Sequence, residues 1–437
     1  MGRGRAFVLG WFIVCAGACA SRCAGADYVI HISVDGLRPD YLQSVITAGN
    51  APNFKRFQDE GAWTNNARTD YTHTITLPNH TSMLTGRPVS LPSGMPAQTQ
   101  HGYTSNSDPS PTTTLHNFTT PAWYKASTFD VVHDAGYSTA LYASKNKFVI
   151  YEQSYNAAGG APHPNGSDKI DTFANPEDSA VMQTLLLAGI PANHFKYTFI
   201  HYADTDDAGH NFGWGTAQYN AAITKIDGFL GQLFNLVQTD STLAGRTAIV
   251  LSADHAGAGS GHSDATLAVD YTIPFYAWGA GVAHGDIYSF NTDTRTNPGF
   301  SRPSYTTPGQ PIRNGDGGNL ALDLIGLGPI PGSLINFGQN LRVAAPGDFN
   351  ADGYVDARDY IVWRKNLGTT YTPGDFSAWR GQFGRTPSGP GSGSATAANA
   401  NIPEPSSLAL LFLAAMLSHL SPRSRARANS TRAQFLP

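Results

Sequence analysis

The stretch LSADHAG at residues 251–257 directly follows TAIV at residues 247–250, a short run of apolar and β-branched residues. Such a run predicts a buried strand. Asp254 and His255 then lie at the carboxyl end of this strand, which is where open α/β sheets bind their ligands. A carboxylate oxygen beside an imidazole nitrogen suits zinc or a similar divalent ion. Because an Asp-His pair also occurs by chance on many loops, a metal site requires further ligands elsewhere in the chain.

Two more apolar runs, residues 28–34 and 197–202, predict strands that end beside acidic side chains. The first is followed by Asp35, where glycine and proline residues break the chain, although a helix cap is the alternative interpretation. The second leads into Asp206 and His210, which would share one face of a helix because they lie four residues apart. A solvated acidic turn is the alternative there. The three residues join Asp254 and His255 as candidate metal ligands.

The alternation of predicted strands and helices indicates an α/β fold with a mostly parallel central sheet and helices on both faces. Further strands are predicted at residues 136–143 and 272–278, and an amphipathic helix at residues 218–237. With 437 residues, the chain has room for one large α/β domain and smaller appendages. Its net charge of −4 gives no reason to expect binding to nucleic-acid duplexes.

The segment TLPNH at residues 76–80 predicts a helix start. A hydroxyl just before a helix N-terminus is well placed to attack phosphorus, because the helix end favours anions. Thr76 is therefore a candidate nucleophile, and a turn threonine is the alternative. Lys145 and Lys147 follow the strand at residues 136–143 and are candidates for binding a substrate anion, although loop lysines are usually solvated.

Both ends of the chain differ in composition from its middle. Residues 1–26 combine arginines, an apolar core and an Ala-Gly-Ala site, which predicts a secretory signal peptide and export to the cell envelope, the surface or the medium. A transmembrane anchor is the alternative, but the apolar core is shorter than the roughly 20 residues of a membrane span. All three cysteines lie in this segment, so the chain from residue 27 has no disulfide and no thiol nucleophile.

After a catalytic domain at residues 27–343, residues 344–386 contain an acidic loop with oxygen ligands at alternate positions and a glycine at its sharp turn. This pattern predicts two short helices around one calcium ion. Its candidate ligands are Asp348, Asn350, Asp352, Tyr354, Asp356 and Asp359. Residues 387–402 indicate a flexible linker, and residues 403–437 combine an apolar run with a basic cluster, which predicts a sorting tail with transient membrane contact.

Four of these motifs together resemble the alkaline phosphatase superfamily, specifically its type I phosphodiesterase/nucleotide pyrophosphatase branch. They are VDG at residues 34–36, TLPNH at residues 76–80, Asp206 with His210, and SADH at residues 252–255. The resemblance implies an alkaline phosphatase-like fold and a secreted hydrolase with two divalent metal ions, for which zinc is expected. One ion would be held by Asp35, Asp254, His255 and the oxygen of Thr76, and the other by Asp206, His210 and a third histidine.

The third histidine is where the chain departs from that branch. The branch carries it in a late His-Gly segment, whereas the comparable residues 313–319 contain no histidine. Other superfamily members have it shortly after the Asp-His pair, which favours His262, on a glycine-rich loop, over its rival His284.

The resemblance also implies a reaction on small phosphorylated substrates. Thr76 would attack a phosphodiester or nucleotide pyrophosphate to form a covalent phospho-threonine, and Asn106, shortly after a His-Gly pair, would bind a phosphate oxygen. The segment with Lys145 and Lys147 is similar to a two-lysine segment of phosphonoacetate hydrolases, so hydrolysis of phosphomonoesters or of a carbon–phosphorus bond is an alternative. A surface-binding protein with an inactive phosphatase-like domain is an alternative of another class.

The C-terminal segments have resemblances of their own. Residues 346–385 resemble a dockerin module, which implies a protein partner. Residues 403–427 resemble a PEP-CTERM sorting signal, which is processed at the bacterial cell envelope.

Overall fold

The computed structural model describes residues 25–91, 94–119, 122–156, 167–368, 371 and 373–385. The expected linker and sorting tail, and nearly all of the expected signal peptide, lie outside the described residues.

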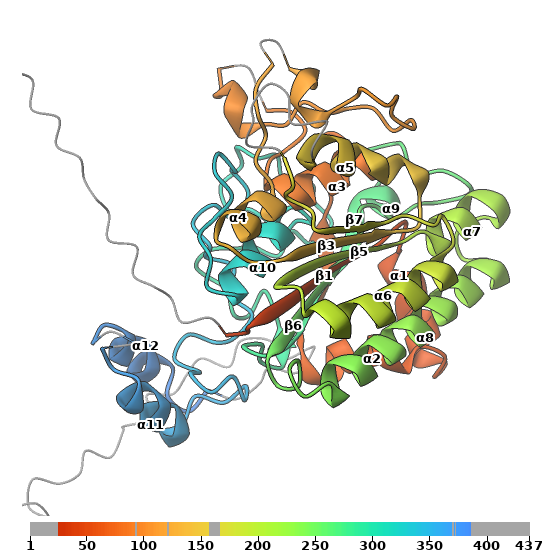
Figure 1. The fold of residues 1–437 in the computed structure, drawn as a ribbon. Coiled ribbons are helices and arrows are strands. Elements are labelled where there is room, and N and C mark those ends of the chain that lie inside the picture. Colours follow the sequence, from red (N-terminus) through yellow and green to blue (C-terminus); the bar gives the residue numbers. More distant parts are fainter. Residues whose placement is uncertain are drawn as a thin grey trace, which may run out of the picture. The chain divides into compact units, whose positions relative to one another are not determined.

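A single eight-stranded sheet forms the centre of the described chain, in the order β4-β3-β5-β1-β6-β7-β2-β8 (Figure 1). The strands are β1 (Tyr28–Val34), β2 (Ala62–Arg68), β3 (Thr139–Ala143), β4 (Thr172–Ala174), β5 (Tyr197–Tyr202), β6 (Thr247–Ser252), β7 (Thr272–Gly279) and β8 (Gly285–Asp286). β1 pairs in parallel with β5 and β6, β3 pairs in parallel with β4 and β5, and only β7 runs antiparallel to its neighbours β6 and β2. The predicted α/β class with a mostly parallel sheet is thereby confirmed.

Helices cover both faces of this sheet, as expected. In Figure 1, α6 and α8 lie on one face with α1 and α2, whereas α4, α10 and α3 lie on the other. The helices are α1 (Pro39–Thr47), α2 (Pro52–Glu60), α3 (Thr76–Thr85), α4 (Thr128–Asp134), α5 (Val149–Tyr155), α6 (Ser179–Asn193), α7 (Asp204–Phe212), α8 (Ala217–Thr239), α9 (Ala268–Tyr271), α10 (Asp316–Leu324), α11 (Ala357–Lys365) and α12 (Asp375–Gln382). None of the helices in the described residues has the length and apolar character that crossing a lipid bilayer requires.

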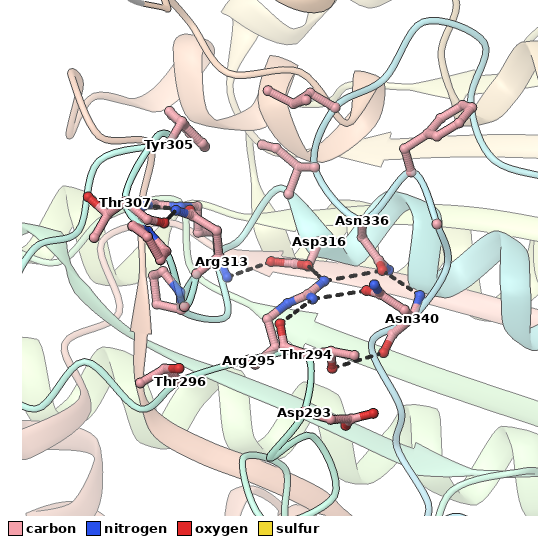
Figure 2. Close-up of a pocket in the computed structure, with 18 of the residues that line it drawn as sticks. Asp293, Thr294, Arg295, Thr296, Tyr305, Thr307, Arg313, Asp316, Asn336 and Asn340 are labelled. Atoms are coloured by element: carbon pink, nitrogen blue, oxygen red, sulfur yellow. Dashed lines mark hydrogen bonds and ion pairs between the residues drawn. The ribbon is translucent and has the colours of Figure 1, made fainter.

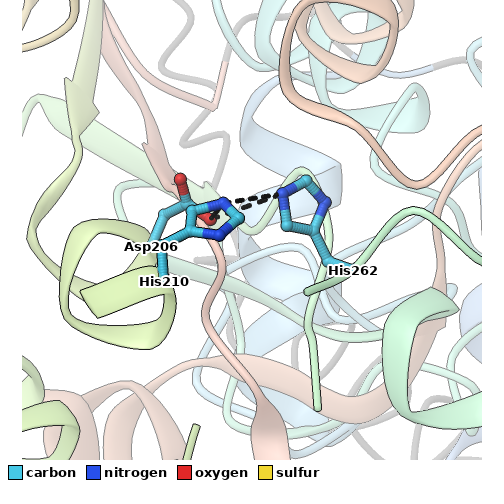
Figure 3. Close-up of side chains that lie close together, drawn as sticks. All are labelled: Asp206, His210 and His262. Atoms are coloured by element: carbon cyan, nitrogen blue, oxygen red, sulfur yellow. Dashed lines mark hydrogen bonds and ion pairs between the residues drawn. The ribbon is translucent and has the colours of Figure 1, made fainter. Parts of the chain in front are cut away.

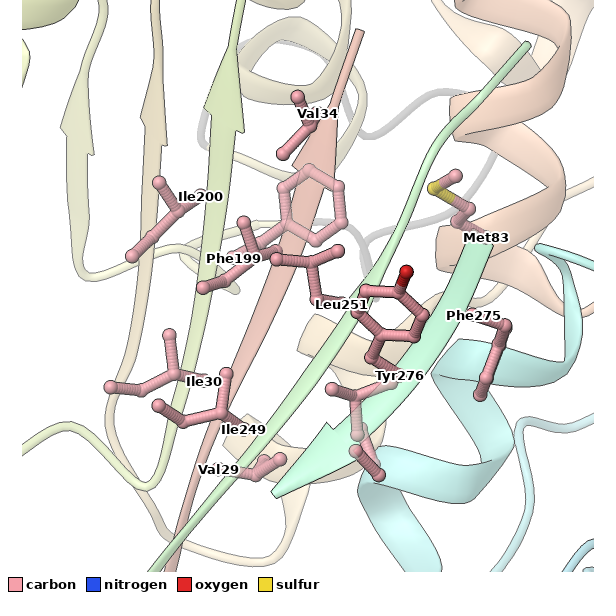
Figure 4. Close-up of a cluster of buried hydrophobic side chains, with 14 of the residues drawn as sticks. Val29, Ile30, Val34, Met83, Phe199, Ile200, Ile249, Leu251, Phe275 and Tyr276 are labelled. Carbon is pink, nitrogen blue, oxygen red and sulfur yellow. The ribbon is translucent and has the colours of Figure 1, made fainter. Parts of the chain in front are cut away.

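The central strands are apolar in sequence because they are buried on both faces of the sheet. Every residue of β5 and β6 is buried, and side chains such as Ile249, Leu251 and Phe199 lie in the buried core on the two faces of the sheet (Figure 4). Each such side chain stabilises the fold by about 1.5–3 kcal/mol relative to an exposed one. The central strands are therefore firmly fixed, and so are the residues at their carboxyl ends.

Local signals set the ends of two elements near the site. α8 extends the helix predicted at residues 218–237 by one residue at its start, where the Thr216 hydroxyl caps the Tyr219 N–H, and by two at its end. β3 begins at Thr139 rather than at Gly136, because Gly136 takes a left-handed conformation (φ 83°) in the turn that precedes the strand.

Two short helices, α11 and α12, follow the sheet domain, as the acidic loop predicts. Aromatic side chains pack between them, with the rings of Trp363 and Phe376 5.1 Å apart and those of Tyr360 and Trp379 5.3 Å apart. The Asp356 side chain caps the start of α11, and that of Asp359 completes a capping box.

Candidate metal centre

The candidate ligands lie at the carboxyl ends of three adjacent parallel strands. Asp35 follows β1, and the Asp254-His255 pair follows β6, which pairs with β1 on one side. On the other side β5 leads into α7, which carries Asp206 and His210 on one face. Because β1 lies between β5 and β6, the fold brings these residues to one edge of the sheet.

The first group of ligands consists of Asp35, Asp254 and His255, all fully buried. The Nε2 atom of His255 lies 3.2 Å from the nearer Asp254 oxygen and 3.3 Å from that of Asp35. Three candidate ligand atoms thus face one another in a buried space.

The second group consists of Asp206, His210 and His262 (Figure 3). The Nδ1–H of His210 donates to the Ser260 carbonyl at 2.9 Å, and that of His262 donates to the Thr74 carbonyl at 2.6 Å. Each Nε2 atom is therefore left with a lone pair, and the two Nε2 atoms are 3.1 Å apart. Two lone pairs at this distance repel unless a cation lies between them, so this pair of imidazoles fits a metal ion.

Each of the three buried carboxylates has one oxygen held by the protein and one without a hydrogen-bond partner among the described residues. Asp35 Oδ2 accepts from Lys145 Nζ at 2.8 Å and lies 3.0 Å from His201 Nε2, and Asp206 Oδ2 accepts from Lys145 Nζ at 2.5 Å. Asp254 Oδ1 accepts from the Gly36 N–H at 3.1 Å.

The unpartnered atoms are Asp35 Oδ1, Asp206 Oδ1, Asp254 Oδ2 and His255 Nε2. Burying such polar atoms without a partner is costly. A mixed set of carboxylate oxygens and imidazole nitrogens that the protein already orients from behind is the donor set that zinc and similar ions prefer.

The two groups are close neighbours. Asp206 Oδ1 of the second group lies 3.9 Å from His255 Nε2 of the first. Gly36 makes this approach possible: its φ is +69°, and a Cβ atom there would lie 3.0 Å from the Asp206 Cα. The geometry is therefore that of one site with two halves.

The electrostatics of the site are those of crowded buried acids. Burial alone would raise the pKa of the Asp35 carboxyl, but the Lys145 ammonium holds it well below its ordinary value. Burial and the charge of Asp35 together raise the pKa of Asp254 well above its usual range. Burial alone would lower the pKa of His255, but Asp254 and Asp35 raise it to about 9, whereas burial lowers the pKa of His262 to about 3. The proton on His255 and the ammonium of Lys145 therefore offset part of the negative charge of the buried carboxylates, which divalent ions would otherwise neutralise.

Thr76 is the first residue of α3 and is 1% exposed. Contacts on either side connect it to both groups. The backbone carbonyl of Thr74, two residues earlier, accepts from His262 of the second group. His80, one helical turn later, donates its Nδ1–H to the Thr76 carbonyl at 2.8 Å, and this nitrogen lies 3.6 Å from Asp254 Oδ2 of the first group.

The other candidate substrate ligands are placed differently from one another. Asn106 Oδ1 accepts from the Leu77 N–H at 3.0 Å, so this side chain lies beside the first turn of α3. Its amide nitrogen has no hydrogen bond within the described part of the chain. Lys145 contacts both acid groups, whereas Lys147 forms no ion pair with a described residue. His284 precedes β8 at an edge of the sheet and joins neither group.

Sequence reasoning assigned no role to His201 or His80, although both contact the candidate ligands. His201 lies near the end of β5, in register with Ser33 of β1, and reaches Asp35. The sequence does contain one signal for His201: it is a histidine within an otherwise apolar strand, one residue before the carboxyl end at which the ligands gather. His80 belongs to the TLPNH motif, and its Nε2 atom lies 2.8 Å from the Ser33 hydroxyl. Both histidines hold the site from behind.

In the acidic segment at residues 348–359, backbone N–H groups donate to two of the acidic side chains. Asp348 accepts from the Gly353 N–H at 2.9 Å, and Asp359 accepts from the N–H groups of Phe349 and Asp356, both at 2.8 Å. Burial raises the pKa of Asp348 to about 7, and the charge of Asp359 contributes.

A hollow of about 510 Å³ elsewhere in the chain shares no residue with either group (Figure 2). Arg295 crosses it and pairs with Asp316 at 2.7 Å, and it also donates to Asn340 at 2.9 Å. Because the hollow contains none of the candidate metal ligands, we assign it no part in the chemistry.

Residues 29–292 match the family model for type I phosphodiesterase / nucleotide pyrophosphatase. Solved structures similar to the chain include murine ectonucleotide pyrophosphatase / phosphodiesterase 5, as an inactive variant in complex with AMP, with a TM-score of 0.47 and 15% sequence identity over 72% of this chain and 99% of that chain. The human protein of the same name has a TM-score of 0.47 and 14% identity over 72% and 99% of the two chains. The alkaline phosphatase PafA has a TM-score of 0.45 and 15% identity over 71% and 97%. No curated protein matches the chain in sequence.

Proposed function

The chain belongs to the type I phosphodiesterase / nucleotide pyrophosphatase family and is therefore a phosphoric-ester hydrolase; on this premise we propose that it cleaves phosphodiesters or nucleotide pyrophosphates at a centre of two divalent metal ions. The observation that supports the proposal is the set of buried carboxylate and imidazole atoms that face one another without hydrogen-bond partners among the described residues.

We assign one ion to Asp35, Asp254, His255 and the Thr76 oxygen, and the other to Asp206, His210 and His262. Zinc suits this mixture of oxygen and nitrogen ligands. Two such ions supply Lewis-acid chemistry, because they neutralise charge on the phosphoryl oxygens and on the entering and leaving groups.

Thr76 is the proposed nucleophile. Its oxygen forms a bond to phosphorus while the bond from phosphorus to the departing alkoxide or nucleotide breaks in line, and the hydroxyl proton passes to the departing oxygen or to solvent. The product is a phospho-threonine, which keeps the second ester group when the substrate is a diester. Water then hydrolyses this ester and restores the threonine hydroxyl. The N-terminus of α3 favours the phosphoryl anion through the positive end of the helix dipole.

Asn106 is the proposed ligand of a phosphoryl oxygen. Its Oδ1 atom is already held by the Leu77 N–H, which turns the amide nitrogen into the free donor of this side chain. Lys145 and Lys147 remain candidates for binding the substrate anion.

A second candidate function changes the bond that is cleaved. The Lys145 ammonium lies beside both acid groups, where it would also meet an additional negative charge on the substrate. This placement favours phosphomonoesters or phosphonates, which carry more charge than a diester.

A kinetic comparison on the purified, zinc-loaded protein separates the two functions. The substrates are bis-p-nitrophenyl phosphate, p-nitrophenyl phosphate, a nitrophenyl ester of thymidine monophosphate, and phosphonoacetate. Diesterase function predicts that kcat/KM for the best diester exceeds that for the monoester by more than about tenfold, or about 1.4 kcal/mol of barrier. A smaller ratio contradicts the first proposal. Asp254→Asn is the control, because it should lose every activity that belongs to this site and thereby exclude a contaminating phosphatase.

We also propose an organisation for the whole chain from its sequence patterns. Residues 1–26 would direct export, residues 27–343 form the catalytic domain, and residues 344–386 form a dockerin-like module that binds one calcium ion and a protein partner. Residues 387–402 would be a linker, and residues 403–437 a sorting tail with transient membrane contact. Export to the envelope or beyond suits a hydrolase of external phosphorylated compounds.

A further inference from the structure

Lys145 connects the two halves of the candidate metal centre. It lies two residues after the end of β3, and its side chain is only 14% exposed. Its Nζ atom lies 2.8 Å from Asp35 of the first group and 2.5 Å from Asp206 of the second. Within the described residues, no other lysine or arginine forms an ion pair with either carboxylate. One ammonium therefore bridges the two groups.

The oxygens that Lys145 contacts are not the ones that face the other ligands. It binds the Oδ2 atom of both Asp35 and Asp206, whereas the Oδ1 atoms face the histidines and have no hydrogen-bond partner among the described residues. The lysine can thus remain in place while the Oδ1 atoms bind ions. It holds both carboxylates in position from behind, as the outer partners of metal ligands commonly do.

Lys145 also differs from the other groups behind the ligands in its charge. The backbone N–H of Gly36 that holds Asp254 is neutral. His201 shares Asp35 Oδ2 with the lysine, but it is a buried imidazole with no second acidic partner within hydrogen-bond distance. Among the groups that hold the ligand carboxylates from the side away from the other ligands, Lys145 alone is a permanent cation in contact with both groups.

We propose that Lys145 is a resident counter-cation: it keeps the buried acids assembled when no metal ion is bound, and its charge weakens the binding of the ions. This inference depends on the proposed metal ligands, but not on Thr76 or on the identity of the substrate. The alternative is that Lys145 serves only to bind the substrate anion.

Lys145→Met tests the proposal, because methionine keeps most of the length and apolar volume of the side chain but removes its charge. Lys147→Met is the matched control two residues away. We expect metal-free Lys145→Met, measured by calorimetry in a chelator, to melt at least several degrees below the wild type, since two buried carboxylates lose their cation. Its zinc Kd, measured by competition with a chromophoric chelator, should tighten by about tenfold, since the repulsion between like charges is removed. Lys147→Met should change neither quantity.

Two results would overturn the inference. One is an unchanged melting temperature and zinc Kd in Lys145→Met, with only KM for the substrate raised, which is the result for a pure substrate ligand. The other is weaker zinc binding in Lys145→Met, which would show that the ammonium assists the ions. If Lys145→Met does not fold without metal, zinc should restore its fold, because the ions replace the missing charge; failure to fold with zinc would also overturn the proposal.

The same measurements separate this inference from the proposed function. The metal centre itself is contradicted if the wild-type protein binds no zinc, or if it binds zinc no more tightly than Asp254→Asn does. Wild-type protein that binds zinc tightly, together with a Lys145→Met variant identical to it, contradicts only the role of the lysine. Lys145→Arg, which keeps a positive charge, should stay closer to the wild type than Lys145→Met in both melting temperature and zinc Kd.

Discussion

The imidazole rings of His255 and His262 lie face to face, with their centroids 3.6 Å apart and only 6° between their planes. His255 belongs to the first ligand group and His262 to the second, so the two groups are in direct contact through these stacked rings. The β6 strand places one ring, and the glycine-rich loop after it places the other. This ring contact is a second close approach between the two groups, beside that of Asp206 and His255.

Replacing Thr76 by alanine should lower kcat by about 10³-fold or more, because no other residue is proposed to form the covalent intermediate. Zinc content, measured by atomic absorption after dialysis, should largely survive, since the carboxylate and imidazole ligands remain. Thr76→Ser keeps a hydroxyl and is the control that should retain part of the activity. Unchanged turnover in Thr76→Ala would remove Thr76 from the mechanism.

Replacing His262 by alanine should remove about one of the two zinc ions and most of the activity. The Nε2 atom of His262 faces that of His210 at 3.1 Å, so its loss leaves the second group with two ligands from the protein. His284→Ala is the matched control and should keep both ions. If His284→Ala loses the metal and His262→Ala does not, the assignment of the third histidine is wrong.

Zinc binding should tighten as the pH rises from about 6 to about 9. In the metal-free protein the carboxylates of Asp254 and Asp35 overcome the effect of burial and raise the pKa of His255 to about 9. The ring is therefore protonated at neutral pH and must release its proton before it can bind an ion. Below that pKa, each pH unit should weaken binding by up to about tenfold. A zinc Kd that stays constant over this range would exclude His255 as a ligand.

Calcium should bind to the acidic loop before α11, and weakly, because Asp359 stands where such loops have a bidentate glutamate. Isothermal titration of the zinc-loaded protein should show one calcium site, and Asp352→Ala should weaken its Kd by about tenfold or more. Asp375→Ala, at the start of α12 and outside the acidic loop, should leave the Kd unchanged. Equal binding by wild type and Asp352→Ala would place calcium elsewhere.

The strands that carry the site could be predicted because burial on both faces leaves a strong signal in the sequence. β1 and β5 have the bounds of the predicted runs, and β6 extends the run at residues 247–250 by two residues. β2 was not predicted, because its two asparagines fall where its register shifts between Thr64 and Ala67, and neither an apolar run nor an alternating pattern results.

The contacts behind the ligands could not be read from the sequence in the same way. Lys145 meets Asp35 and Asp206 only because β3 pairs with β5 and β5 with β1, and local periodicity does not specify which strands become neighbours. Lys147, two residues later, looks equivalent in the sequence but forms no ion pair within the described part of the chain. Side chains whose partners are more than 60 residues away require the tertiary structure.

Gly36 has no side chain, and this allows the two ligand groups to lie close to each other. Its N–H donates to Asp254, and a Cβ atom here would lie 3.0 Å from the Asp206 Cα, so even a single methyl group would push the two ligand groups apart. In the proposed two-metal centre, Gly36→Ala would leave every ligand in place but move the two sites apart, so the ions should still bind individually but no longer act together on one phosphoryl group.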